Sequence, residues 1–96
     1  MSELDDLKRD YRTGLLRYLV RRDEAVLHTG YMLGRSAVAN GLSILDLSQV
    51  HHEVLIEVLE DTPREDLGRV ATSASEFFVE ALATFDMTQR SFLGGR

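Results

Sequence analysis

Apolar residues recur every three or four positions along this 96-residue chain, and no segment alternates apolar and polar residues cleanly. The three-to-four-residue spacing places side chains on one face of an α-helix, whereas alternation is typical of a half-buried strand. One proline and seven glycines also leave few turn residues for a chain of many strands. The pattern therefore predicts an all-α protein.

Four segments carry the helical pattern, with short connections between them. They cover about Glu3 to Val20, Asp23 to Ala39, the residues after Ser43 to about Leu59, and Pro63 to about Ser91. Antiparallel helices with short connections are typical of helical bundles. We expect a single domain, residues 1–96, that forms a four-helix bundle with a long fourth helix.

Cap residues support these bounds. Asn40-Gly41 is a stop signal for the second helix, because both residues tolerate the left-handed backbone that ends helices. Ser43 is a suitable N-cap for the third helix. Thr62 and Glu65 have the spacing of a capping box with Pro63 at the first helical position, which predicts the start of the fourth helix.

Three glycines lie inside the first two predicted helices, where glycine costs up to ~1 kcal/mol relative to alanine. Gly14 interrupts the apolar stripe of the first helix, and Gly30 and Gly34 lie one turn apart in the second. No strand or lysine accompanies them, as a phosphate-binding loop would require. We interpret all three as places where a neighbouring segment approaches closely.

The fourth helix carries a seam of Ala and Phe residues. Its members alternate four and three residues apart: Leu67, Ala71, Ala74, Phe78, Ala81 and Phe85, widened by Val70, Phe77, Leu82 and Met87. This heptad-like spacing is typical of helices that pack along their length on a partner helix. A chain of 96 residues has a small core, which contact with a second copy would stabilise. The seam therefore predicts contacts both within the bundle and in a homodimer.

Composition narrows the function. The formal net charge is −5 and the arginines are dispersed, which argues against a nucleic-acid partner. The absence of cysteine excludes disulfides, Cys-ligated zinc and Cys nucleophiles. The charged start has no apolar signal-peptide core, and no apolar run approaches ~18 residues. We expect a cytoplasmic protein without a membrane span.

The sequence His51-His52-Glu53 is the candidate for chemistry. His51 lies on the apolar stripe of the third helix, whereas His52 is rotated about 100° from it, so the two cannot easily chelate one metal. We expect His51 to be a core residue bonded to backbone or to an acid, and His52 to lie on the surface. Neighbouring acids at helix starts match the helix dipole. The sequence therefore predicts no catalytic residue, no metal and no cofactor.

Several short stretches resemble a known family. They are Tyr11, Leu15, Leu16, Arg17 and Tyr18 in the first helix, Glu24 and Arg35-Ser36 in the second, Val50-His51 and Val54-Leu55 in the third, and Phe77, Glu80 and Met87 in the fourth. In their order and spacing they resemble the amino-terminal domain of RsbU-type serine phosphatases of bacterial stress signalling. The chain departs from that pattern at Gly14, and at His28, where the family has an aromatic residue.

The resemblance implies an all-helical, homodimeric regulatory domain that precedes a metal-dependent Ser/Thr phosphatase. In the family, an RsbT-type switch kinase binds this domain and stimulates the phosphatase, which dephosphorylates an anti-anti-sigma factor and so frees a sigma factor. The chain shows none of the phosphatase's metal-binding aspartates in a familiar context. We therefore expect a domain excised from a longer protein or preceding a catalytic domain, and no catalysis by these 96 residues.

The resemblance also implies partner-binding residues on the second and fourth helices, namely Glu24, His28 and Val79. Glu24 and His28 are one turn apart and share a face, and Val79 lies off the Ala/Phe seam. Two alternatives remain open from the residues alone. One is a plain homodimerisation module of another signalling protein, and the other is a small His- or metal-dependent enzyme.

Overall fold

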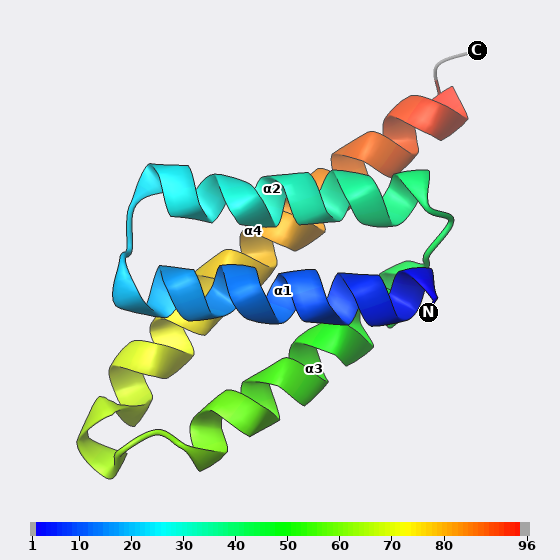
Figure 1. Cartoon of the computed structure of the whole chain (residues 1–96). Helices are drawn as coiled ribbons and strands as arrows, with labels where there is room; N and C mark the ends of the chain where they lie inside the picture. Colours follow the sequence, from blue (N-terminus) through cyan, green and yellow to red (C-terminus); the bar gives the residue numbers. More distant parts are fainter. Residues whose placement is uncertain (1, 95–96) are drawn as a thin grey trace.

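Four α-helices and one 3₁₀ turn make up residues 2–94, the part of the chain that this computed structural model describes (Figure 1). The elements are α1 (Glu3–Val20), α2 (Glu24–Ala39), α3 (Ile44–Glu60), the 3₁₀ turn η1 (Arg64–Asp66) and α4 (Leu67–Gly94). No strand occurs within residues 2–94, so the all-α prediction is confirmed. Over the same residues, no helix is both long and apolar enough to cross a membrane.

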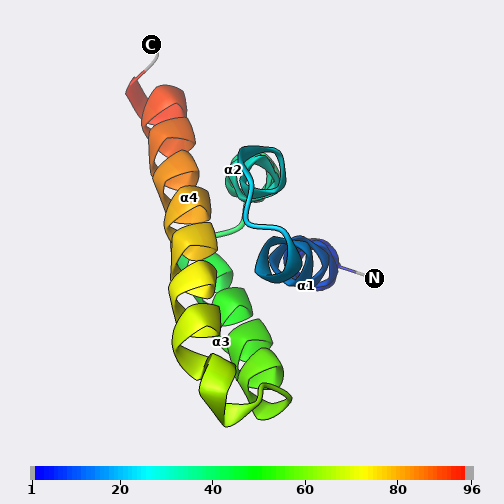
Figure 2. The ribbon, with the colours of Figure 1, turned by 90° about the vertical axis from the view of Figure 1, so that its left-hand side faces the viewer.

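The helix α4 packs against each of the other three helices. The antiparallel pair α1 and α2 forms one layer, and α4 crosses it obliquely from behind (Figure 1). Seen from the side, the N-terminal half of α4 lies beside α3 and its C-terminal half beside α2 (Figure 2). The four helices therefore form two crossed layers, one of α1 and α2 and one of α3 and α4, and α4 packs on both α3 and α2.

Local sequence fixes the starts of the first three helices. Ser2 and Asp23 cap α1 and α2, because each side chain accepts a hydrogen bond from the backbone N–H three residues later. Ser43 Oγ accepts from the Asp46 N–H at 3.0 Å, and the Asp46 carboxylate accepts from the Ser43 N–H at 2.9 Å. The N-cap prediction at Ser43 is confirmed, and with Asp46 it forms a reciprocal capping box.

The predicted capping box at Thr62 is wrong. The Thr62 hydroxyl donates to the Val58 carbonyl at 2.6 Å, so it satisfies the end of α3 instead of the start of α4. Pro63 precedes η1 without any side-chain cap bond, and α4 begins at Leu67, four residues later than predicted. Because the Thr62 hydroxyl bonds to a carbonyl at the end of α3, it does not cap the start of α4.

The core combines one stripe from each helix. Its buried members include Leu7, Tyr11, Leu15, Leu33, Ala37, Leu47, Val50, Val54, Ala74, Phe77, Ala81 and Phe85. On α4 the predicted seam is only partly correct, since Leu67 and Ala71 are exposed and the central place belongs to Phe77. A strict heptad drifts about 20° per repeat on a straight helix, so the seam leaves the buried face towards the N-terminus of α4. The buried part of the seam packs inside the protomer and offers nothing to a second copy.

Close helix approach occurs at all three predicted glycines. A Cβ at Gly34 would overlap the carbonyl oxygen of Ala81 and lie 2.9 Å from the Phe85 nitrogen. A Cβ at Gly30 would lie 3.2 Å from the Phe77 carbonyl oxygen, and one at Gly14 would lie 2.9 Å from the Phe77 ring. The backbones of α2 and α4 are therefore in direct contact, with the Phe77 ring reaching under α1.

Replacing Gly34 with alanine tests this packing. We expect Gly34→Ala to lower the free energy of unfolding by about 1–3 kcal/mol, because the added methyl group overpacks a backbone contact that cannot give way. Gly68→Ala is the matched control, since its Cβ would meet no atom within 4 Å. The control should stabilise α4 by up to about 1 kcal/mol. Equal effects of the two changes in urea unfolding would contradict the close approach.

Candidate partner-docking surface

The three predicted partner-binding residues are exposed and lie on α2 and α4, which pack on each other. Glu24 is the first residue of α2 and His28 follows one turn later on the same face. Val79 lies in the middle of α4 and is 57% exposed. None of the three belongs to the core, so their side chains remain available for contact with another molecule.

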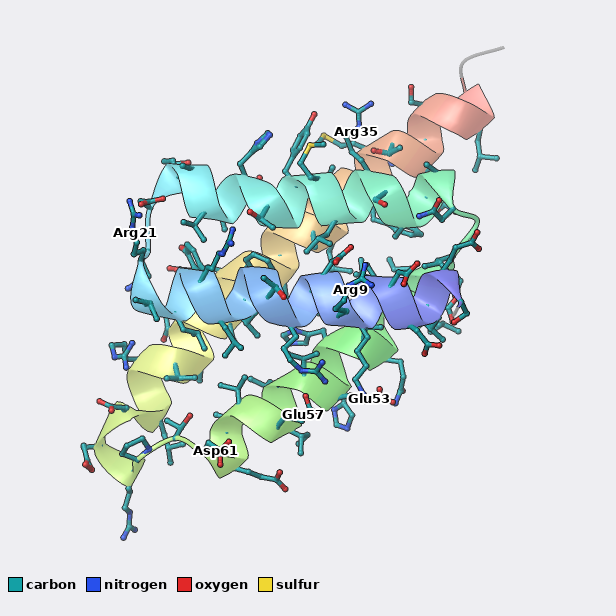
Figure 3. The ribbon with its side chains drawn as sticks, viewed as in Figure 1. Arg9, Arg21, Arg35, Glu53, Glu57 and Asp61 are labelled. Carbon is teal, nitrogen blue, oxygen red and sulfur yellow. The ribbon has the colours of Figure 1, made fainter. Side chains whose placement is uncertain are left out.

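A row of side chains continues from Glu24 along the outer face of α2. The His28 ring stacks on Tyr31 with centroids 4.8 Å apart and planes 15° from parallel. The guanidinium carbon of Arg35 lies 6.0 Å from the Tyr31 ring centroid, within reach of a cation–π contact. Arg35 stands at the outer edge of α2 (Figure 3). We call Glu24, His28, Tyr31 and Arg35 the α2 row.

Sequence reasoning did not include Tyr31 and Arg35 among the binding residues, although their spacing was available. Positions 24, 28, 31 and 35 are four, three and four residues apart, which places them on one helix face. Tyr31 and Arg35 also line a shallow cavity of about 250 Å³ with Thr88 and Ser91 of α4. The α2 row therefore extends the candidate surface towards the C-terminal part of α4.

Val79 points away from α2. It is two residues from both Phe77 and Ala81, which are fully buried, and at 100° per residue its side chain lies about 200° from each. Glu80 marks the border, because its Cβ lies 3.6 Å from the position of a Cβ on Gly30. The structure brings Glu24 and His28 together, and a partner that also contacts Val79 has to reach around the edge of α4.

A polar clamp fixes the start of α2 and hence the position of Glu24. The Tyr18 hydroxyl donates to the Glu76 carboxylate at 2.9 Å, and Arg22 Nη2 lies 2.7 Å from both oxygens of the same carboxylate. These bonds, that of Tyr18 first, lower the pKa of Glu76 below its usual value. The clamp joins the α1–α2 connection to α4, and Glu76 was not anticipated from sequence because its partners are distant in the chain.

His51 has a structural role. Its Nδ1 lies 2.7 Å from the Tyr11 hydroxyl, and its ring stacks on Phe78 with centroids 3.9 Å apart. We assign the hydroxyl as donor, because burial raises the pKa of Tyr11 and keeps it protonated. The prediction of a core histidine is confirmed only in part, because His51 is half-buried at the edge of the core and its partner is a tyrosine instead of backbone or an acid. His52 is exposed, also as predicted.

Metal-ligating side chains do not gather anywhere in the described part of the chain. Within residues 2–94, no group of three or more His, Asp or Glu side chains is placed to hold a metal ion. The two adjacent histidines diverge, with His51 packed on Phe78 and His52 in solvent.

Comparison with known proteins identifies the family. Residues 9–88 match the family model of the N-terminal domain of the phosphoserine phosphatase RsbU. The chain belongs to this family. No curated protein and no solved structure matches the chain significantly. The RsbU N-terminal domain is a regulatory part of a phosphatase and not its catalytic part, and the match includes Glu24, His28 and Val79.

The Tyr11–His51 contact predicts a pH-dependent stability. Burial, with a smaller contribution from the charge of His52, lowers the pKa of His51 from 6.5 to about 4. Between these values the unfolded chain binds a proton that the folded protein does not, so stability falls as the pH drops from about 6.5 to about 4. The loss attributable to His51 should be on the order of 1–2 kcal/mol, because solvent screens part of the effect on this half-buried ring.

Urea unfolding across this pH range measures the effect, with two glutamine variants for comparison. His51→Gln should flatten the pH dependence, and His52→Gln should change it only slightly, because the charge of His52 supplies the smaller part of the His51 shift. An unchanged pH profile in His51→Gln would contradict a buried neutral imidazole.

Proposed function

We propose that this chain is a non-catalytic regulatory and dimerisation domain that docks an RsbT-type switch kinase through Glu24, His28 and Val79. Docking activates an attached serine phosphatase in bacterial stress signalling by partner switching, which controls a sigma factor. The observation that carries the proposal is the stacked α2 row, together with an exposed valine on the neighbouring helix α4, in a member of the RsbU N-terminal domain family.

Each of the three residues suits a different part of a docking contact. Glu24 presents a carboxylate in the first turn of α2, where its negative charge complements the positive end of the helix dipole. The His28 ring is already stacked on Tyr31, so its ordering costs little entropy on binding. Val79 supplies apolar area, since 57% of its surface is exposed in the protomer. A kinase surface with a cation opposite Glu24 and an apolar pocket for Val79 fits this set.

Dimerisation rests on apolar side chains outside the core. The buried part of the Ala/Phe seam is occupied within the protomer, so we place the dimer contact at the C-terminal end of α4, where Leu93 is exposed. This part of α4 extends past the end of α2 (Figures 1 and 2). Two copies joined there would present two kinase surfaces, one on each protomer.

The same exposed residues also suit a plain homodimerisation module of another signalling protein, which would not bind the kinase. A His- or metal-dependent enzyme has weaker support, because His51 is committed to Tyr11 and Phe78. Titration with the kinase separates the first of these alternatives from the proposal.

Isothermal titration against the RsbT-type kinase tests the docking residues. We expect Glu24→Lys and Val79→Asp each to weaken binding by about tenfold or more, because each puts an unfavourable charge into the contact. Glu65→Lys and Ile56→Asp are matched controls at exposed positions of the 3₁₀ turn and α3, and they should bind like the unchanged protein.

Circular dichroism and light scattering on the same samples should show unchanged helicity and a dimeric mass. Unchanged affinity in both docking variants would refute the surface, and a monomeric mass at micromolar concentration would refute the dimer.

A further inference from the structure

Two cavities flank Leu16 on the C-terminal half of α1. One, of about 480 Å³, lies between α1 and α3 and is lined by Arg12, Leu16, Glu57, Val58, Asp61 and Thr62. The other, of about 470 Å³, lies towards the α1–α2 connection and is lined by Leu16, Arg17, Val20, Arg21 and Val26. Because Leu16 lines both cavities, it forms a ridge between two grooves.

The ridge is apolar and uncovered. Leu16 is 45% exposed and Val20 is 83% exposed, and the two lie one turn apart on the same face of α1. Val58 and Val26 lie half-buried in the two grooves and extend the apolar surface on either side. A ridge with grooves on both sides has the shape that accepts the apolar face of an amphipathic helix.

The end of α3, which borders the first groove, has an excess of negative charge. The end of α3 carries Glu57, Glu60 and Asp61 and has no basic residue in its last turn, although this end of a helix dipole is negative. Arg12 neutralises Glu57 at 2.7 Å, but no ion pair within residues 2–94 involves Asp61. Figure 3 shows Glu57 and Asp61 along α3. A positively charged side chain from another molecule would reduce the repulsion among these carboxylates at the rim of the groove.

We propose that the Leu16–Val20 ridge docks an amphipathic helical segment of another protein, whose apolar side chains fill the two grooves and whose edge towards α3 carries Lys or Arg. Charge decides against a second copy as the occupant, because this chain has a net charge of −5 and would bring further negative charge to an acidic rim. The ridge lies on α1, and its one α2 residue, Val26, is rotated about 200° from Glu24 and His28, so this proposal and the kinase proposal stand or fall separately.

Methyl-group NMR of the whole chain tests the ridge, with a blocked amphipathic peptide as the probe. The peptide needs about 15 residues to form a helix, with leucines on one face and lysines along one edge. We expect saturable shifts at the methyl groups of Leu16, Val20, Val26 and Val58. Leu16→Gln should weaken binding by about tenfold and Asp61→Asn by about threefold, as expected for a central apolar anchor and a rim charge.

Ile56→Gln is the matched control, because Ile56 is also 45% exposed but lines neither groove. It should change the affinity by less than about twofold. Four results would overturn the proposal: no saturable shifts at these methyl groups, equal binding of a peptide with Glu in place of Lys, an equal loss in Ile56→Gln, or shifts that follow protein concentration alone. The last result would mean that a second copy covers the ridge.

Discussion

The backbones of α2 and α4 approach so closely at Gly34 that a methyl group there would overlap the Ala81 carbonyl oxygen. This approach lets the Phe77 ring pass beneath Gly30 and Gly14 and reach α1. There it meets Tyr11 edge-on, with centroids 5.2 Å apart. Tyr11 in turn holds His51 of α3. One backbone contact thus sets the positions of all four helices, because each further aromatic contact depends on where α4 lies.

The candidate docking surface depends on the same contact. Glu24 and His28 belong to α2 and Val79 to α4, so their relative positions are fixed only if these two helices do not slide. The clamp from Tyr18 and Arg22 to Glu76 adds a second fixed point near the start of α2. The surface is therefore built on packed helices instead of mobile loops, as the proposed docking of a partner requires.

Local signals in the sequence were sufficient for the starts and ends of α1, α2 and α3, for the close approach at the glycines and for the contrast between His51 and His52. Each of these depends on neighbours within one or two turns. The start of α4 and the phase of its seam could not be predicted in the same way, because Thr62 bonds back to α3 and Phe77 is selected by tertiary packing. The Tyr11 partner of His51 and the Glu76 clamp join residues 40 or more apart, so spacing gave no sign of them. The roles of Glu24, His28 and Val79 remain predictions.

Hydrogen–deuterium exchange of the chain with and without the RsbT-type kinase tests the central claim most directly, since it maps the contact without any substitution. A kinase docked across the α2–α4 edge should slow amide exchange in residues 24–31 of α2 and 76–83 of α4, and leave α1 and α3 largely unchanged. Protection confined to α1 and α3, with α2 and α4 unaffected, would contradict the docking surface.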